Sequence, residues 1–564
     1  MWTYGGSYPG LTIRRPTGQT THVTFTNNLP SIAGAMTVHH HGNHSVSADD
    51  GQAAGASFLF GTGASRTYTF EGTEDGGNER GTMQFYHDHR MGEAGLNVWM
   101  GLQALYILDD PADPATLPSG AYELPLLIAD RQFDANNQLE YYYDQAGVVG
   151  DKVLVNGVYE PYMDVADRKY RLRILNGANA RIYILTLSNG DAFTQIGTES
   201  GLLPAPVSRT AMEFGPAERL DVVVDFAGRS GQEIYLMDAY KMTPVLKFRV
   251  NQHATDNSSI PSTLRPLPDI GAPTVTRNFS FDFTSNHWTI NGLSFNPGRI
   301  DARPVLGTTE RWVFTNPTGS THLVHIHDVD QQCLSRDGGP CYPYEAMKET
   351  WSVGPGETLE LKLKFTDHLG MYMLHCHILE HEDDGMMTLF EVVPPVVPTQ
   401  VVSRKMHGGT PFDINLPLSG SPGIECRSGG ATGDYQVVFT FPGAVAFNGA
   451  AVTAGAGTVN STSGSGSTSV TVNLTGVANA QTATVKLLGV NNGTSSNDVS
   501  VQIGVLIGDT NWDGFVNAGD ALQTRNRAGQ AVDATNFRSD VNEDGFVNSG
   551  DTTIVRSRSG TFLP

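Results

Sequence analysis

Four compact groups of histidine constrain this chain more than any other feature of its sequence. Ten of its 17 histidines are candidate metal ligands within the groups HHHG, HDH, HLVHIH and HCHILEH. In a β-strand, residues i and i+2 project from the same face, so each His-x-His pair can present two imidazoles to one site. Eight imidazoles suit three first-row transition-metal ions that keep open positions for a small ligand. The eight paired histidines are His39, His41, His87, His89, His325, His327, His375 and His377.

The cysteine inside the HCHILEH group predicts a second metal site. Cys376 must point to the strand face opposite His375 and His377, so its thiolate serves a metal on the far side of the same backbone. A thiolate with two imidazoles and a weak thioether describes a blue-copper electron-transfer site. The peptide links that flank the cysteine then form a short covalent path between the two sites. The residues available to complete the thiolate site are His322, His381 and Met386.

Simpler explanations of the histidines fit less well. A single His-x-His pair is often only a packed or hydrogen-bonded feature of a protein surface. Four pairs together, one of them enclosing a cysteine, are poorly explained in that way. Zinc also binds histidine, but a structural zinc site usually needs only four ligands and has no use for a thiolate joined to a second cluster.

Short β-rich runs separated by clusters of Gly, Pro and Asn predict an all-β fold of stacked sandwiches. Joints rich in Pro and Asp near residues 109–118 and 262–273 divide the first part of the chain into three. After about residue 397 the composition changes to Gly, Ser, Thr, Ala and Val, which predicts a small Ig-like β-sandwich without identifiable chemistry. The expected domains are residues 1–112, 113–262, 263–396, 397–505 and 506–564.

Charge and hydropathy argue against two classes of protein. The formal net charge is −22 and no basic stripe is present, so a nucleic-acid partner is not expected. No run of about 18 apolar residues occurs, so no membrane span is expected. Strand-like sequence begins almost at once after Met1 without a secretory signal, which suggests a truncated or processed chain.

The remaining cysteines bear on the compartment in which the protein works. Cys333 and Cys341 lie eight residues apart in a loop that contains Gly and Pro. They can pair, which fits an oxidising compartment, or they can remain two reduced thiols. Cys426 is left over.

The motifs of residues 1–396 resemble those of the three-domain multicopper oxidases, which include laccases, bilirubin oxidases, spore-coat laccases and periplasmic cuprous oxidases. The resemblance includes YPGLTIR from Tyr8, VTFTNNLP from Val23 and the highly specific HCHILEHEDDGMM from His375. It implies three cupredoxin-like Greek-key β-sandwiches. It also implies a laccase-like enzyme that takes single electrons from a donor at one copper and delivers four of them to dioxygen at a three-copper cluster.

The resemblance assigns ligands residue by residue. It implies that His39 and His325 bind the type 2 copper. It implies that His41, His87 and His377 bind one type 3 copper, and that His89, His327 and His375 bind the other. The type 1 copper is expected on His322, Cys376, His381 and an axial Met386, rather than on the neighbouring Met387. His40 is expected to face away from the metals.

The same resemblance suggests where protons, electrons and donors enter. Asp50 and Glu382 are expected either to supply protons for oxygen reduction or to orient ligands and balance charge. Donors are expected to give electrons at the edge of His381 or His322, and Cys376 to carry them onward. An axial Met implies a lower type 1 potential than a non-coordinating side chain, which favours phenols, aromatic amines or bilirubin-like pigments.

Two other functions stay open. The first is a cuprous or ferrous ion oxidase, which the acidic chain permits, although no long Met-rich insertion favours it. The second is a non-enzymatic adaptor on a cupredoxin scaffold, which the retained ligands argue against. The chain departs from the family at its N-terminus, where the first strands of the opening domain are expected to be missing and to leave an unprotected sheet edge.

The C-terminal segment contains an internal repeat, DTNWDGFVNAGD at 509–520 and DVNEDGFVNSGD at 540–551. Its oxygen ligands match positions 1, 3, 5, 7, 9 and 12 of a calcium loop, with Asp in place of Glu at position 12. The repeat resembles duplicated, largely helical dockerin modules, which bind two calcium ions and dock onto cohesin partners. The alternative is that calcium only folds this small segment. A secreted or cell-surface location is expected. The candidate calcium ligands are Asp509, Asn511, Asp513, Phe515, Asn517, Asp520, Asp540, Asn542, Asp544, Phe546, Asn548 and Asp551.

Overall fold

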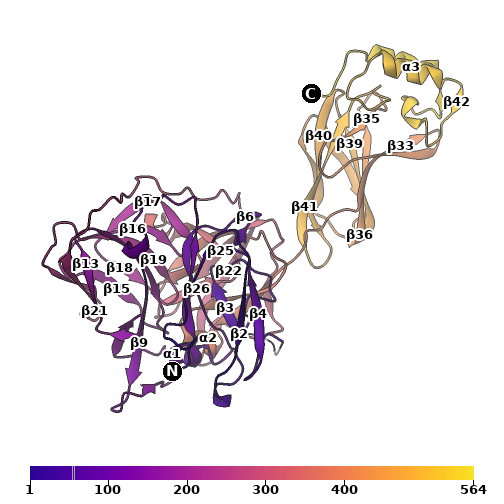
Figure 1. Cartoon of the computed structure of the whole chain (residues 1–564). Coiled ribbons are helices and arrows are strands. Elements are labelled where there is room, and N and C mark those ends of the chain that lie inside the picture. Colours follow the sequence, from indigo (N-terminus) through magenta and orange to yellow (C-terminus); the bar gives the residue numbers. More distant parts are fainter. Residues whose placement is uncertain (54, 56) are drawn as a thin grey trace. The chain divides into compact units, whose positions relative to one another are not determined.

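The computed structural model describes residues 1–53, 55 and 57–564, and these form two compact units, Met1–Val393 and Pro394–Pro564 (Figure 1). Strands dominate both units, and the helices are short, so the predicted all-β fold with a helical C-terminal segment is confirmed. The division between the units falls close to the boundary predicted at residue 396. The other predicted domain limits lie within the units and remain predictions. Within the described residues, no helix has the length and apolar character needed to cross a membrane.

The first sandwich of the N-terminal unit is small. Its four-stranded sheet packs around a core of tyrosines and aliphatic side chains. The sheet has the order β1 (Ile13–Pro16), β8 (Gln103–Asp109), β7 (Thr82–Asp88) and β3 (Val38–His41). The remaining elements are the pair β2 (Thr21–Thr26) and β4 (Ser65–Phe70), the hairpin β5 (Thr73–Glu74) and β6 (Gly77–Asn78), and helix α1 (Ala94–Met100).

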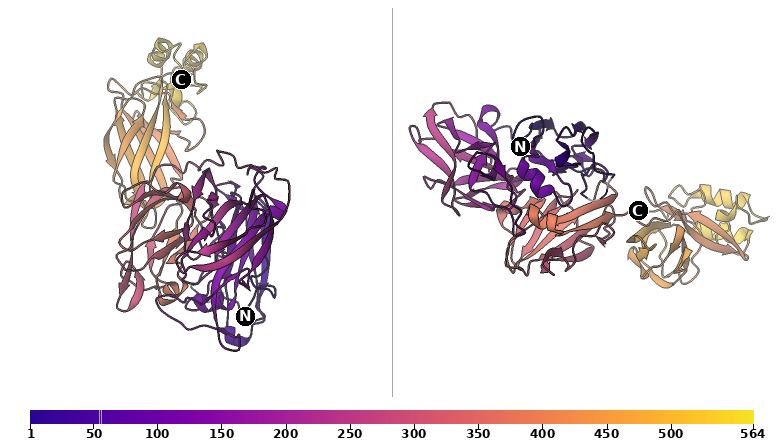
Figure 2. Two further views of the ribbon diagram at one scale, coloured as in Figure 1. Left: turned by 90° about the vertical axis from the view of Figure 1, so that its left-hand side faces the viewer. Right: turned by 90° about the horizontal axis from the view of Figure 1, so that it is seen from below.

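The second sandwich consists of an eight-stranded and a five-stranded sheet around the largest core of this unit. Its strands are drawn in purple and magenta in Figure 2. The larger sheet has the order β12 (Val158–Tyr159), β11 (Lys152–Val155), β9 (Glu123–Phe133), β14 (Lys169–Asn176), β19 (Arg219–Asp225), β16 (Phe193–Thr198) and β17 (Gly201–Arg209), with β10 (Leu139–Glu140) beside β9. The smaller sheet has the order β13 (Tyr162–Ala166), β21 (Thr243–Gln252), β20 (Glu233–Asp238), β15 (Tyr183–Leu187) and β18 (Met212–Phe214).

The third sandwich carries the HLVHIH and HCHILEH groups. Its six-stranded sheet has the order β23 (His287–Ile290), β22 (Val275–Thr284), β25 (Thr309–Thr315), β30 (Thr358–Lys364), β27 (Gln331–Arg336) and β28 (Met347–Lys348). Its five-stranded sheet has the order β24 (Ile300–Ala302), β32 (Met387–Val392), β31 (Gly370–Cys376), β26 (His322–Ile326) and β29 (Thr350–Val353), and helix α2 (Leu379–Asp384) follows β31. A disulfide joins Cys333 to Cys341, so the first of the two alternatives for this pair holds.

Strand register brings the histidine groups together. In the first sandwich, β3 pairs with β7 so that His39 lies opposite His87. In the third, β26 pairs with β31 so that His325 lies opposite His375. Because side chains alternate along a strand, these two ladders fix which face each imidazole occupies.

The C-terminal unit begins as a two-sheet sandwich. One sheet has the order β34 (Thr410–Asn415), β33 (Gln400–His407), β36 (Tyr435–Val445), β39 (Ser467–Thr475) and β38 (Thr458–Ser463). The other has the order β35 (Gly423–Glu425), β41 (Ser496–Val505), β40 (Gln481–Asn491) and β37 (Gly449–Ala454). Helices α3 (Ala518–Asn526) and α4 (Ser549–Ser557) lie side by side after it (Figure 2), with the short pair β42 (Gln530–Ala531) and β43 (Phe546–Val547).

This sandwich and the helical segment share one hydrophobic core. Val437 and Val485 of the strands belong to the same buried cluster as Val516, Val541 and Val555 of the helical segment. Burial of apolar side chains is the main favourable contribution to folding. The stability of the two calcium-loop sequences is therefore linked to the sandwich that precedes them.

Candidate metal centres

The eight paired histidines converge where the first and third sandwiches meet. Each is at most 4% exposed. Their Nε2 atoms face one another and sort the rings into one pair and two triplets, the same sets that the resemblance implies. The Nε2 separations are 3.2 Å for His39–His325, 3.0 Å for both His41–His87 and His41–His377, 3.2 Å for His89–His375 and 3.1 Å for His327–His375.

The other ring nitrogen of most of these histidines faces an oxygen of the protein. A carbonyl oxygen can only accept a hydrogen bond, so Nδ1 carries the proton and Nε2 keeps its lone pair. This is the usual arrangement around metal-bound histidine. The Nδ1 distances are 2.6 Å from His39 to Asp50 O, 3.0 Å from His41 to Glu349 Oε1, 2.8 Å from His87 to Asp88 O, 3.1 Å from His325 to Glu349 O, 2.8 Å from His327 to Asp50 Oδ2 and 3.0 Å from His375 to Cys376 O.

Burial keeps these imidazoles neutral. It lowers the pKa of His87 and of His375 to about 3, and it lowers the pKa of His41 well below the usual value, with the neighbouring histidines adding to the effect. Neutral imidazole is the form that binds transition metals. Unprotonated Nε2 lone pairs that face each other at about 3 Å repel unless cations lie among them, so the residues fit a metal cluster.

A second site lies on the other face of β31. The Sγ atom of Cys376 is 3.6 Å from Nδ1 of His322 and 3.6 Å from Nδ1 of His381, and these two nitrogens are 3.2 Å apart. All three side chains are at most 1% exposed. Burial raises the pKa of the Cys376 thiol to about 12, so a metal cation is needed to stabilise the thiolate here. Two nitrogens and one sulfur in a compact triangle fit a blue-copper site.

The two neighbouring methionines differ in their surroundings. Met386 is fully buried in the same hydrophobic cluster as Cys376, and its carbonyl accepts a hydrogen bond from the Cys376 N–H at 3.1 Å. Met387 lies opposite His375 in the ladder between β31 and β32 and belongs to a different cluster. The surroundings thus favour Met386 as the thioether near the thiolate.

Comparisons with known proteins agree with this chemistry. Residues 1–113 and 268–396 match the sequence profiles of the multicopper oxidase family, and residues 507–558 match that of the dockerin type I domain. The laccase of Bacillus subtilis is 31% identical over 467 residues, which cover 70% of this chain and 90% of that protein. The chain belongs to the multicopper oxidases. It is therefore a copper-dependent oxidoreductase that uses dioxygen, with a dockerin module at its C-terminal end.

Two further similar proteins are a bilirubin oxidase and a second laccase. The bilirubin oxidase of Albifimbria verrucaria is 34% identical over 421 residues, which cover 69% of this chain and 72% of that protein. The crystal structure of a laccase from Pediococcus acidilactici superposes with a TM-score of 0.64 and 33% identity, covering 70% of this chain and 85% of that one.

The two predicted acidic residues of the oxidase both contact ligand histidines. Asp50 Oδ2 accepts a hydrogen bond from Nδ1 of His327, and Glu382 Oε2 is 3.2 Å from Nδ1 of His375. Burial raises the pKa of both carboxyls well above the usual range, with Asp328 adding to the effect at Asp50. The structure thus brings both carboxyls to the cluster, where orienting ligands and carrying protons are compatible roles.

His40 points elsewhere. Its ring lies 4.4 Å from that of Phe70 and 4.3 Å from that of Tyr106, measured between centroids. Neither ring nitrogen has a hydrogen-bond partner among the described residues. The alternation of side chains along β3 turns His40 away from the face that carries His39 and His41.

Several residues that contact the ligands have no recognisable signal in the sequence. Thr318 Oγ1 lies 2.9 Å from Nε2 of His322, and the ring of Trp288 packs 4.2 Å from that of His381. Glu349 contacts His41 and, through its carbonyl, His325. None of the three belongs to a recognisable motif, and only the fold brings them to the site.

The two calcium-loop sequences have matching hydrogen bonds. At position 1 of the first loop, Asp509 accepts from the N–H groups of residues 513 and 514 at 3.2 and 2.9 Å, and Asp540 accepts from those of residues 544 and 545 at the same distances. Position 12 of each loop, Asp520 or Asp551, also completes the capping box that begins α3 or α4. Carboxylate, amide and carbonyl oxygens at these spacings fit a hard cation such as Ca²⁺.

One contact distinguishes the second loop from the first. Nδ1 of His407, at the end of β33, lies 2.8 Å from Oδ2 of Asp540. Arg427 donates to Nε2 of the same ring at 3.1 Å, which leaves Nδ1 to carry the proton. Among the described residues, no sandwich side chain makes this contact with Asp509. The sandwich thus supports only the second loop in this way.

Proposed function

We propose that this oxidase is laccase-like and oxidises phenols, aromatic amines or bilirubin-like pigments one electron at a time, with dioxygen reduced to water. The observation that carries the proposal is the placement of Cys376 between His375 and His377, with sulfur and imidazoles directed to different sites. Copper bound at the two sites would accept electrons from the donor and pass them to dioxygen. We infer one type 1, one type 2 and two type 3 ions, held by the ligand sets given above.

The Cys376 segment would conduct electrons between the sites. Its backbone joins the sulfur directly to both flanking histidines. In addition, its carbonyl oxygen accepts a hydrogen bond from Nδ1 of His375 at 3.0 Å, which offers a shortcut through the peptide. The route is therefore covalent or hydrogen-bonded throughout.

We propose that donors enter a cavity of about 440 Å³ beside the thiolate site. Thr318 and Trp288 form part of its wall, and these residues contact His322 and His381 respectively. Its other lining residues are Asp282, Phe283, Thr284, Pro317 and Gly319. An aromatic wall with one carboxylate suits aromatic donors that are neutral or cationic.

Asp50 and Glu382 are proposed to hold the ligands and to move protons. Oδ2 of Asp50 accepts a hydrogen bond from Nδ1 of His327, and Oε2 of Glu382 lies 3.2 Å from Nδ1 of His375. Both carboxyls are buried beside ligands of the cluster, where protons are consumed as dioxygen is reduced.

The decisive experiment is an absorption and spin-resonance spectrum of the copper-loaded protein. An intense thiolate-to-copper band is expected, and its absence would end the proposal for the Cys376 site. Turnover on phenols should then be compared with turnover on cuprous and ferrous ions. Faster oxidation of the metal ions would favour the metal-oxidase alternative.

We also propose that the dockerin module binds two calcium ions through the ligands of its two loops, and docks onto a cohesin partner outside the cell. The matching hydrogen bonds of the two loops and the family match support calcium binding. Calcium titration of the full chain, followed by binding to a recombinant cohesin module, tests both steps. Calcium uptake without cohesin binding would favour a purely structural role for the ion.

A further inference from the structure

The second sandwich holds none of the proposed copper ligands, yet it sends one side chain to the edge of the cluster. Arg219, at the start of β19, is 2% exposed. Its guanidinium donates hydrogen bonds to the carbonyl of Met83 at 3.2 Å and to that of Ala217 at 2.7 Å, and it contacts Oε1 of Glu349. The two backbone contacts fix the plane of the guanidinium that faces the carboxylate of Glu349.

Glu349 touches two proposed ligands of different copper ions. It lies between β28 and β29 in the third sandwich and is 3% exposed. Its Oε1 atom is 3.0 Å from Nδ1 of His41, and its carbonyl oxygen is 3.1 Å from Nδ1 of His325. The two imidazoles stack with centroids 4.0 Å apart. One residue thus sets the orientation of both rings.

We propose that Arg219 and Glu349 form a positioning pair for the three-copper cluster, with Arg219 acting through Glu349 on His41. The guanidinium holds the carboxylate, the carboxylate accepts the Nδ1 proton of His41, and the Nε2 lone pair of His41 is thereby directed at the metal. The inference rests on the proposed function, because His41 is a ligand only if copper occupies the cluster.

The three ligands of one set differ in the hydrogen-bond partner of Nδ1. His41, His87 and His377 form one triplet, and Nδ1 of His377 has no hydrogen-bond partner among the described residues. His87 is held by the carbonyl of Asp88, one residue away. His41 is held instead by a side chain distant in sequence, so its orientation depends on how the sandwiches pack.

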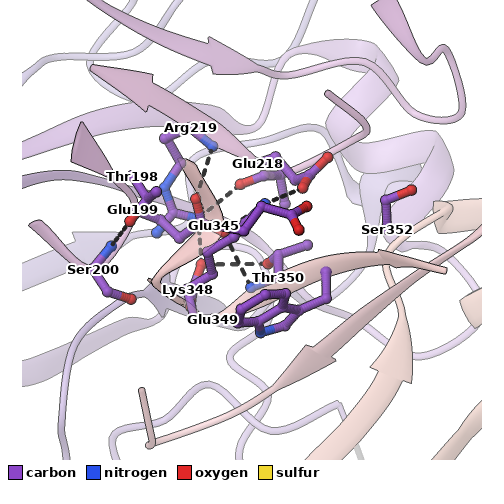
Figure 3. A network of polar contacts seen from close by, with 12 residues as sticks. Thr198, Glu199, Ser200, Glu218, Arg219, Glu345, Lys348, Glu349, Thr350 and Ser352 are labelled. Carbon is purple, nitrogen blue, oxygen red and sulfur yellow. Dashed lines mark hydrogen bonds and ion pairs between the residues drawn. The ribbon is translucent and has the colours of Figure 1, made fainter. Parts of the chain in front are cut away.

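The second sandwich also holds the segment that carries Glu349. Lys348 Nζ contacts Glu218 and lies 3.7 Å from Glu199, and the N–H of Thr350 lies 3.3 Å from Oε1 of Glu199 (Figure 3). Both neighbours of Glu349 are therefore attached to the second sandwich. Figure 3 shows these charged groups in one network of polar contacts with Arg219 and Glu349. Because Glu349 contacts Arg219 and both of its sequence neighbours are held, its carboxylate has little freedom to move away from His41.

Three variants of the full chain test the pair: Arg219→Met, Glu349→Ala and the double variant. Glu349→Ala removes the carboxylate from His41 but keeps the carbonyl on His325. Loss of an outer contact of this kind typically lowers metal affinity 10- to 100-fold. We expect that loss for cluster copper, seen in copper per chain and in the spin-resonance spectrum of the cluster, while the blue band is unchanged.

The double variant decides whether Arg219 acts through Glu349. If it does, the double variant loses no more cluster copper than Glu349→Ala alone, because the two effects share one path. It also removes both charges, so it avoids the unpaired buried charge that can unfold a single variant. Additive losses, or normal cluster copper in the double variant, overturn the proposal.

Arg173→Met is the matched control. Arg173 is another buried arginine of the second sandwich, 3% exposed and 2.7 Å from Glu123, and it does not contact the cluster. The Arg173→Met variant should have a lower unfolding free energy but should retain cluster copper. Parallel loss of the blue band and the cluster signal in Glu349→Ala would indicate general unfolding and contradict a positioning role. Absence of a cluster signal from the wild-type protein would instead refute the proposed function.

Discussion

Replacement of His407 by alanine tests how strongly the sandwich of the C-terminal unit supports the second calcium loop. His407 is 2% exposed and makes two hydrogen bonds, one to Asp540 and one from Arg427. A hydrogen bond to a charged group contributes about 1.5–3 kcal/mol. Both partners keep another bond, from the N–H of Gly545 at 2.9 Å and to the carbonyl of Phe412 at 2.7 Å, so the lower value applies to each.

The expected loss for His407→Ala is therefore about 3 kcal/mol of the unfolding free energy of the C-terminal unit. For a unit of this size, 1 kcal/mol shifts the melting temperature by about 2–4 °C, which predicts a decrease of about 6–12 °C. Calorimetry of the calcium-loaded full chain measures it. Loss of the blue colour identifies the transition of the N-terminal unit, and sensitivity to a calcium chelator identifies the other.

His253→Ala is the matched control for this substitution. Nδ1 of His253 lies 2.9 Å from Asp167, almost the same distance as in the His407 pair, but its side chain is 84% exposed. Exposed pairs contribute about 0–1 kcal/mol. The shift in melting temperature of the C-terminal unit in His407→Ala should exceed the shift of the N-terminal unit in His253→Ala. Equal shifts would show that the reasoning from burial is wrong.

Three further predictions concern the thiolate site, calcium removal and a buried carboxylate. Cys376→Ser should abolish the blue colour and donor oxidation while cluster copper remains bound, and wild-type turnover in that variant would refute the electron route. A calcium chelator should destabilise the whole C-terminal unit, because its two parts share a core, but should leave the blue band intact. Loss of the blue band together with unfolding of the C-terminal unit would contradict independence of the two units. Burial pushes the pKa of Glu425 up, but contacts with Arg427 and Ser403 outweigh it and hold the pKa below its usual value of 4.5. The unfolded chain therefore binds this proton first as pH falls, and the stability present above about pH 4.5 is lost below it. Glu425→Gln should be less stable at neutral pH and should lose less stability on acidification, measured as the melting temperature of the C-terminal unit; equal acid sensitivity of the two proteins would contradict this.

Much of the copper chemistry could be predicted because strand geometry is local. The alternation of side chains places His375 and His377 on one face of a strand and Cys376 on the other, whatever the rest of the fold does. The spacing of Asp509 to Asp520, with glycine at position 6, similarly describes a loop that folds on itself. Such features need no knowledge of distant residues.

The supporting residues could not be predicted, because they meet only after folding. Glu349 is separated from His41 by 308 positions, and His407 from Asp540 by 133. Neither glutamate nor histidine differs in sequence context from many residues without such a role. The shared core of the C-terminal unit was equally hidden, since valines at 437 and 541 carry no mark that they belong together.

The pairing of His39 with His87 and of His325 with His375 makes metal retention a test of correct folding. A slip of one residue in either ladder would turn an entire row of side chains to the opposite face. A misaligned β26, for example, would then offer Val324 and Ile326 where the imidazoles belong, and the protein would stay colourless and copper-poor. Insertions in the segments that connect these strands should accordingly be judged first by the copper content of the purified protein.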